Sequence, residues 1–355
     1  MSIKKITIEA FLEQAVHYPV LDVRSPGEFT HAHIPGAYSL PLFTDDERKI
    51  VGTAYKQQGK QKAIKIGLDY FGVKMCSMVE QVEAIVKARQ LSNNTNEHPN
   101  RILVHCWRGG MRSAGVAWLL DLYGFEVYTL VGGYKTFRNW VLNQFESPYD
   151  AKIVGGFTGS GKTEILAHLQ GLNQPVIDLE GLAHHKGSAF GGIGQEPQPS
   201  QEMFENKLAW FLSLYKDSSF WLEDESQRIG VLNIPAAFWK TMRLMPVYFV
   251  EIPFENRLQY ILDTYGSLEK EKLVNAIIRI QKRLGPLETK TAIGYLIEGD
   301  TRACFRILLQ YYDKTYEKSL LKRENIEVLL NKISCNSVDS LSNTKNLLSC
   351  SSVHI

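Results

Sequence analysis

Two short loops carry the side chains that are best suited to chemistry. Residues 106–113 have the sequence Cys-Trp-Arg-Gly-Gly-Met-Arg-Ser, and residues 156–163 have the sequence Gly-Phe-Thr-Gly-Ser-Gly-Lys-Thr. A cysteine thiolate is a nucleophile, whereas a glycine-rich loop can close its backbone N–H groups around phosphate oxygens. Because one chain holds both loops, we expect one substrate to meet both chemistries.

The first loop directly follows an apolar run at residues 101–105 and precedes a predicted helix that begins near Arg112. Neighbouring cations, backbone donors and a helix N-terminus lower the pKa of a thiol from its ordinary value of ~8.5. We therefore predict Cys106, Arg108 and Arg112 as catalytic residues. Trp107 either stacks on a ring of the substrate or, the slightly favoured interpretation, packs against its own domain. The remaining cysteines are interpreted as core or tail residues: Cys76, Cys304, Cys335 and Cys350.

The second loop fits the pattern G-x-x-x-x-G-K-[ST], with an apolar strand predicted before it and a helix after it. Asp224, or else Glu223, follows the predicted strand at 219–222 and is the expected carboxylate on the metal side; a surface acidic turn is the alternative. Thr163 could hold a magnesium ion, but the need for magnesium and its ligands stay open. The predicted phosphate-binding residues are Gly156, Thr158, Gly159, Ser160, Gly161, Lys162, Thr163 and Asp224.

A third segment, residues 178–191, is rich in glycine and histidine and suits a lid or a substrate-binding loop. His184 and His185 could contact an anion or transfer a proton. Neighbouring residues of an extended chain point to opposite sides, so at most one of the two is expected to face the substrate. Together with Ser188 and Trp107, they are the predicted substrate contacts. The molecule attached to the phosphates stays open, since the loop would grip ATP or any other pyrophosphate.

Bulk properties limit the class of protein. A chain of 355 residues, with 44% hydrophobic and 22% charged residues, predicts two folded domains. Five scattered cysteines and no signal-peptide or membrane-helix pattern lead us to expect a cytoplasmic protein. The net charge of +2 gives no general attraction to a polyanion, so RNA binding would need local basic clusters, which could equally be solvated surface. The candidates are Lys56, Lys60, Lys62 and Lys65; Arg279, Lys282 and Arg283; and Lys318, Lys322 and Arg323.

The alternation of apolar strands with helical segments predicts an α/β fold with parallel sheets. We expect a first domain at residues 1–145 and a second at 146–333, with strands at 152–155, 175–179, 219–222 and 246–252. The Ser- and Asn-rich residues 334–355 are expected to form a disordered tail.

Residues 21–29 and 33–37, together with the thiol loop, resemble the rhodanese family over about residues 5–140. The resemblance implies a cysteine that carries a persulfide or a heavier chalcogen analogue. Five residues separate Cys106 from Arg112, where many sulfurtransferases have four. The wider loop resembles that of cell-cycle dual-specificity phosphatases, which hold a phosphate-sized anion.

A rhodanese-like domain ahead of a P-loop NTPase-like parallel-sheet domain, with His-His-Lys-Gly-Ser-Ala-Phe-Gly at 184–191 and Glu-Asp-Glu-Ser at 223–226, resembles the tRNA 2-selenouridine synthase family. The resemblance spans about residues 5–330. It implies an enzyme that acts on wobble 2-thiouridine in the tRNAs for lysine, glutamate and glutamine. The sulfur is geranylated from geranyl diphosphate and then replaced by selenium from selenophosphate, with no tightly bound cofactor and no membrane partner; a monomer is one option.

In that scheme, residues 156–163 would hold the diphosphate, and Arg108 and Arg112 would bind a phosphate group. Cys106 would either take selenium from selenophosphate or assist the loss of the geranyl thiol. The main alternative is an ATP-dependent rhodanese-type sulfurtransferase acting on RNA. Others are a cysteine phosphatase with a regulatory nucleotide-binding domain, and an RNA-binding scaffold, which the intact Cys106, Lys162 and Thr163 argue against.

Overall fold

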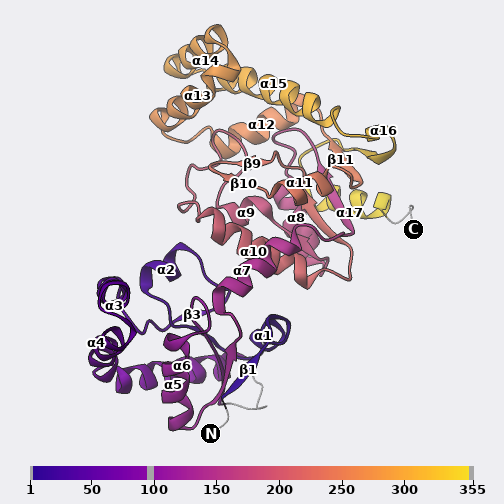
Figure 1. The fold of residues 1–355 in the computed structure, drawn as a ribbon. Helices are drawn as coiled ribbons and strands as arrows, with labels where there is room; N and C mark the ends of the chain where they lie inside the picture. The colour runs from indigo at the N-terminus through magenta and orange to yellow at the C-terminus, as the bar shows by residue number, and fades with distance from the viewer. Residues whose placement is uncertain (1–2, 94–99, 352–355) are drawn as a thin grey trace. The chain divides into compact units, whose positions relative to one another are not determined.

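The computed structural model describes residues 3–93 and 100–351. The chain divides into two compact units, Met1–Asn143 and Gln144–Ile355, so the division lies two residues before the predicted boundary. Each unit holds a five-stranded sheet in which all strand pairs are parallel (Figure 1). The predicted α/β class is confirmed. None of the helices in the described part of the chain is long and apolar enough to cross a membrane.

The sheet of the first unit has the order β1-β5-β4-β2-β3. The central strand β4 ends at His105, so the thiol loop leaves its carboxyl end and leads directly into helix α6. The strands are β1 Lys4–Ile6, β2 Val20–Asp22, β3 Tyr38–Ser39, β4 Arg101–His105 and β5 Glu126–Leu130. The helices are α1 Ile8–Ala15, α2 Pro26–His31, α3 Asp45–Gln57, α4 Lys60–Gly72, α5 Met75–Asn93, α6 Met111–Tyr123 and α7 Gly133–Gln144.

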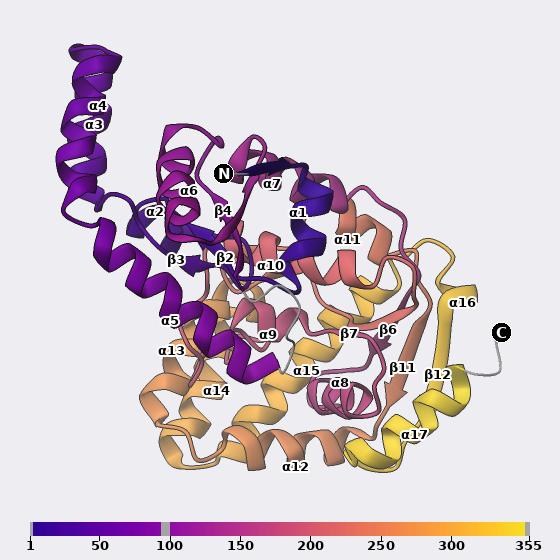
Figure 2. The same ribbon diagram turned by 90° about the horizontal axis from the view of Figure 1, so that it is seen from below.

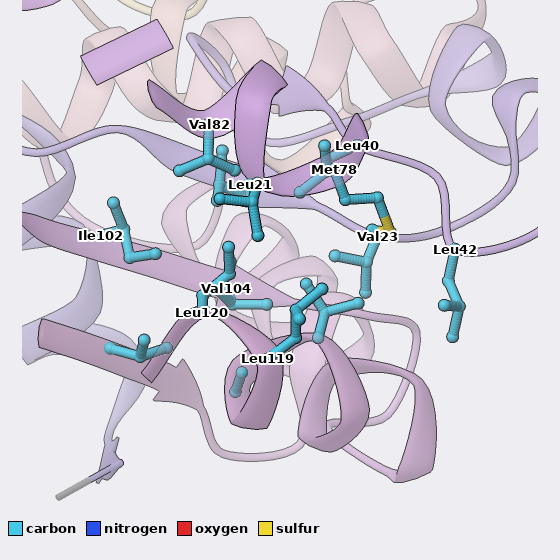
Figure 3. Packing of buried hydrophobic residues seen from close by; sticks show 14 of the residues in the cluster. Leu21, Val23, Leu40, Leu42, Met78, Val82, Ile102, Val104, Leu119 and Leu120 are labelled. Carbon is cyan, nitrogen blue, oxygen red and sulfur yellow. The ribbon is translucent and has the colours of Figure 1, made fainter. Parts of the chain in front are cut away.

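Helices cover both faces of this sheet, which explains why β4 is apolar nearly throughout. Ile102, Leu103 and Val104 of β4 are fully buried. Figure 3 shows Ile102 and Val104 packed with Leu21 of β2, Leu120 of α6 and other apolar side chains. Each such side chain contributes about 1.5–3 kcal/mol by leaving water. This packing fixes the strand end from which Cys106 projects.

The sheet of the second unit has the order β12-β11-β6-β8-β7. The phosphate loop joins the central strand β6 to α8, as predicted. The strands are β6 Ala151–Gly155, β7 Val176–Ile177, β8 Phe220–Glu223, β11 Val247–Glu251 and β12 Leu330–Ser334, with a separate hairpin of β9 Arg228–Ile229 and β10 Leu232–Asn233. The helices are α8 Lys162–Gly171, α9 Leu179–Ala183, α10 Gln201–Leu214, α11 Ala236–Met242, α12 Phe254–Tyr265, α13 Lys270–Leu284, α14 Pro286–Glu298, α15 Thr301–Leu320, α16 Ile326–Leu329 and α17 Ser340–Ser351.

The prediction of a disordered tail from residue 334 is wrong for residues 334–351. Ser334 ends β12, which pairs in parallel with β11, and α17 packs against α8. Leu347 of α17 and Cys335 are buried in the same apolar cluster as Ile165 of α8. A few apolar side chains therefore hold a segment whose composition is otherwise polar. Residues 352–355 lie outside the described residues.

Candidate functional site

The sulfur of Cys106 lies in a ring of hydrogen-bond donors. The residue is buried, and its Sγ is 3.2 Å from Oγ of Ser113, in the first turn of α6. Burial alone would raise the pKa of the thiol, but the Ser113 hydroxyl and the backbone N–H groups of Ser113, Arg108 and Gly110 reverse that effect and lower it. The loop thus lowers the pKa of this thiol, which is the predicted direction.

Glycines allow the loop to close on the strand beside it. Gly109 has φ +63°, and Gly133 has φ +61° at the start of α7. A Cβ on Gly133 would lie 2.3 Å from the carbonyl oxygen of Cys106, so no larger residue fits there. The Tyr134 N–H donates to the same oxygen at 2.8 Å. Sequence reasoning missed this support, although the Gly-Gly pair after the apolar run at 126–130 was a signal for it.

The two predicted arginines differ in their surroundings. Arg112 Nη1 donates to Oε2 of Glu28 at 2.8 Å, so a carboxylate already compensates its charge. Arg108 is exposed and has no ion pair within the described part of the chain. An anion that enters this loop would therefore meet Arg108 and the backbone N–H groups as its uncompensated positive partners.

Trp107 packs against its own unit, as the favoured interpretation predicted. Its ring lies 5.6 Å from the ring of Tyr134, which also stacks under the guanidinium of Arg24 at 3.7 Å. Trp107 is still 37% exposed, so part of its ring remains available to a substrate.

The phosphate loop has the backbone conformation that its glycines predicted. Gly156, Gly159 and Gly161 all have positive φ, at +153°, +82° and +72°. Lys162 Nζ donates to the Gly156 carbonyl oxygen at 3.0 Å, across the mouth of the loop. The Ser160 hydroxyl donates to the Phe157 carbonyl oxygen at 2.7 Å and is buried, so it serves the loop's own shape.

The carboxylate beside Thr163 is not the predicted one. The Thr163 hydroxyl donates to Oε2 of Glu180 at 3.1 Å. Asp224 instead forms an ion pair with Arg323 and accepts a hydrogen bond of 2.7 Å from the Tyr316 hydroxyl. The Tyr316 hydroxyl also accepts a hydrogen bond of 3.3 Å from the Gly156 N–H. Asp224 therefore helps to position the phosphate loop indirectly, through Tyr316. Sequence reasoning missed Glu180 because its approach to Thr163 depends on α9 packing beside α8.

Two other residues with predicted roles, Glu223 and Arg323, are buried in the structure. Glu223 is buried, and its Oε1 accepts a hydrogen bond of 2.7 Å from the Glu180 N–H. Burial and the neighbouring carboxylates of Asp178 and Glu180 raise its pKa well above the ordinary value. Arg323, which was a candidate RNA contact, is also buried and is committed to Asp224, so that prediction is wrong.

A cavity of about 1290 Å³ extends from the phosphate loop through the second unit. One end is formed by residues 158–163 and Glu180. Helices α12, α13 and α15, which Figure 2 labels in this unit, supply much of the remaining lining. The apolar and aromatic lining there is Phe190, Ile261, Tyr265, Ile280, Phe305, Leu308, Leu309 and Tyr312, and the basic lining is Arg279, Lys282 and Arg283.

Both predicted histidines line this cavity, with Ser188. The expectation that only one of the pair faces inward assumed an extended chain, but His184 has φ +50° and ends α9. His184 Nδ1 is 3.1 Å from the Pro197 carbonyl oxygen. Burial, with the charge of Arg279, lowers the pKa of His185, so its neutral form is favoured. Ser188 Oγ accepts from the Phe190 N–H at 3.2 Å, which shapes the loop over the cavity.

No group of three or more His, Cys, Asp or Glu side chains within the described ranges is arranged to hold a metal ion by itself. Magnesium usually takes one or two protein oxygens and completes its shell with phosphates and water. Thr163 and Glu180 fit that smaller requirement and would be the residues to hold such an ion.

Comparisons with known proteins match both units. The family described as "tRNA 2-selenouridine synthase AAA domain" matches residues 149–345, and the "Rhodanese-like domain" family matches residues 8–139. A "tRNA 2-selenouridine synthase" from Bdellovibrio bacteriovorus is 35% identical, over 88% of this chain and 91% of its own length. Proteins of the same name from Shewanella loihica and Nitrosomonas europaea are 35% and 38% identical, over 86% and 81% of this chain and 88% and 73% of theirs. The predicted order of a rhodanese-like and a P-loop-like domain is confirmed.

Proposed function

The chain belongs to the tRNA 2-selenouridine synthase family, and from that premise we propose that it replaces sulfur by selenium in wobble 2-thiouridine of tRNA through an S-geranyl intermediate. In this proposal the acceptors are the tRNAs for lysine, glutamate and glutamine. Geranyl diphosphate supplies the prenyl group, and selenophosphate supplies selenium.

One observation supports the prenyl step: the cavity that the phosphate loop lines is also lined by aliphatic and aromatic side chains. A prenyl diphosphate needs both an anion cradle and an apolar wall. Tyr265, Ile280 and Tyr312 line the cavity, are only half-buried and offer apolar surface for the prenyl chain, while Lys162 and the loop N–H groups offer donors for the diphosphate.

The proposed first step forms a bond between the thiouridine sulfur and C1 of the geranyl group. The bond from C1 to the diphosphate oxygen breaks, and the base releases its N3 proton. Charge gathers on the departing diphosphate, where Lys162 and the backbone donors of residues 159–163 can stabilise it. Arg279, Lys282 and Arg283, at the cavity wall, have no ion pair within the described residues and could neutralise phosphates that flank the modified base.

The proposed second step uses the first unit. Geranylation converts a poor leaving group into a thiol that can depart from C2 of the pyrimidine. The Cys106 loop offers a thiol whose pKa is lowered, together with Arg108 and backbone donors that could bind a phosphate-like anion. In the selenium step, the Cys106 thiolate would add to C2 and displace the geranyl thiol, which leaves with a proton. Selenium of selenophosphate would then bond to C2 as the bond from C2 to the Cys106 sulfur breaks, and hydrolysis of the P–Se bond would release phosphate and leave selenouridine.

Two variants separate these steps in a tRNA nucleoside assay by mass spectrometry, with geranyl diphosphate added first and selenophosphate second. We expect Lys162→Ala to reduce geranylation by about 100-fold or more, because it removes a cation from the developing charge. Exposed Lys332→Ala is the matched control and should leave geranylation unchanged. Full geranylation by the Lys162 variant would contradict the cradle role.

We expect Cys106→Ala to accumulate geranylated tRNA and to form no selenouridine. Cys76→Ala, at an exposed thiol of the same unit, should behave like the unchanged protein. Equal loss of both steps in the Cys106 variant would refute this division of labour. Rapid hydrolysis of radiolabelled ATP without any use of geranyl diphosphate would favour an ATP-dependent sulfurtransferase instead.

A further inference from the structure

Helices α3 and α4 form an arm on the first unit. Figure 2 shows the pair projecting side by side away from the sheet of that unit. The two helices pack mainly against each other. The arm joins the core at Phe71 of α4, which is buried, at Gly67, which lies against Phe43, and at Val51 of α3. The sulfur chemistry of Cys106 does not require such an arm.

The arm is basic along residues 48–68, and the acidic side chains of its two helices, Asp45, Asp46, Glu47 and Asp69, lie outside that stretch. Residues 48–68 contain six cationic side chains and no acidic one, although the whole chain has a net charge of only +2. All six are exposed. Arg48 approaches Glu28 at 3.7 Å, and the other five have no ion pair or hydrogen bond within the described part of the chain. The six are Arg48, Lys49, Lys56, Lys60, Lys62 and Lys65.

Helix geometry places lysines on both outer sides of the arm. Successive residues lie about 100° apart around an α-helix. On α3, Lys49 and Lys56 share one face, and the buried Ala54 lies on the opposite side. On α4, Lys62 and Lys65 lie away from the buried Gly67. Since the buried faces meet inside the pair, the lysine faces point outward in two directions.

We propose that the α3–α4 arm binds the phosphate backbone of tRNA through both lysine faces, with the α3 lysines on one stretch of backbone and the α4 lysines on another. A planar anionic membrane could contact only one of the two lysine faces. A folded RNA presents stretches of backbone in more than one plane and can contact both faces. The identity of the RNA as tRNA rests on the proposed function, whereas the binding surface rests on the arm alone.

The test measures the affinity of the full chain for 2-thiouridine tRNA as a function of salt. Neutralising a phosphate contributes about −0.9 to the slope of log K against log[salt] for duplex nucleic acid. Lys49→Gln with Lys56→Gln, and Lys62→Gln with Lys65→Gln, should each reduce the magnitude of the slope by about 2, and the quadruple variant by about 4. Glutamine keeps the helix propensity of lysine, and circular dichroism checks that the arm stays helical.

A matched control removes two lysines whose charge is already compensated. Lys272 pairs with Glu269 at 3.2 Å, and Lys332 pairs with Glu251 at 3.3 Å. Lys272→Gln with Lys332→Gln should leave the slope unchanged. The two-sided contact is refuted if the quadruple variant has an unchanged slope. It is also refuted if only one of the two double variants changes the slope. Retained tRNA affinity with lost binding to phosphatidylserine vesicles would assign the arm to a membrane surface and also overturn it.

The outcome is separable from the proposed chemistry. We expect the quadruple variant to geranylate the free nucleoside 2-thiouridine as fast as the unchanged protein, because the arm lies outside the cavity lining. If the arm controls tRNA affinity but no geranyl transfer occurs, the proposed function fails and the arm assignment stands. If geranyl transfer occurs but the arm variants bind tRNA normally, the arm assignment fails and the proposed function stands.

Discussion

At Cys106, two opposing effects set the charge on the sulfur. Burial disfavours a thiolate, whereas hydrogen-bond donors from Ser113, Arg108 and Gly110 stabilise it. The donors have the larger combined effect, so the pKa of the Cys106 thiol is lowered. Only one of these donors belongs to a side chain that can be removed without changing the backbone. Ser113 is therefore the residue through which the nucleophile can be adjusted.

We expect Ser113→Ala to raise the pKa of Cys106 and to move the pH profile of selenouridine formation to higher pH. Below the pKa, each unit of increase reduces the thiolate fraction about tenfold, so the selenium step slows at neutral pH and recovers in alkaline buffer. The geranylation step in the same variant is the internal control, and its pH profile should not move. A selenium step that is slower at every pH by the same factor would instead indicate a structural role for Ser113.

The site residues that could be predicted belong to continuous patterns. Cys106 and Lys162 follow from strand, loop and helix signals within a few positions of each other. Glu180 and Gly133 reach the same sites only through tertiary packing, which no local pattern encodes. Asp224 was selected because it follows a strand, yet its carboxylate turns to Arg323 and Tyr316, which lie about 100 positions further along the chain.

Helix α15 links the cavity wall to the phosphate loop. Its Leu308 and Leu309 line the cavity, and its Tyr316 hydroxyl joins the Gly156 N–H to Asp224. One turn earlier, Asp313 binds Arg257, which also donates to the Thr158 carbonyl oxygen at 3.0 Å. The loop backbone is thus positioned from α15 as well as by its own glycines.

Tyr316→Phe removes the hydroxyl that hydrogen-bonds the Gly156 N–H and Asp224. We expect it to weaken binding of geranyl diphosphate by about 2- to 10-fold, the usual effect of losing a hydrogen bond. The change should appear in KM of the geranylation step, while selenation of tRNA that is already geranylated stays unchanged. Tyr149→Phe removes a comparable hydrogen bond, to the Gln144 carbonyl oxygen, outside the cavity lining and serves as the control. An unchanged KM in the Tyr316 variant would show that the loop holds its shape without α15.

Each unit of the molecule has its own apolar core. Leu21, Ile102 and Val104 belong to the core of the first unit, while Ile165 and Leu347 belong to a cluster of the second. The parallel strands β4, β6, β7, β8 and β11 could be predicted because they are short apolar runs between helices. The second unit's closing elements, β12 and α17, could not, because their burial depends on a few apolar side chains in a polar stretch.

Loss of packing at α17 should therefore affect one unit and spare the other. Leu347 is fully buried against α8, so Leu347→Ala is expected to reduce the free energy of unfolding of the second unit by about 2–5 kcal/mol. Leu341→Ala, on the same helix but 51% exposed, should change it by less than about 0.5 kcal/mol. Hydrogen exchange read by mass spectrometry reports each unit separately, and faster exchange should appear in α8, β11 and β12 but not in β2 or β4. Because Lys162 begins α8, diphosphate affinity should fall along with this stability. Equal exchange in the two variants would mean that residues 340–351 do not stabilise the sheet that positions the phosphate loop.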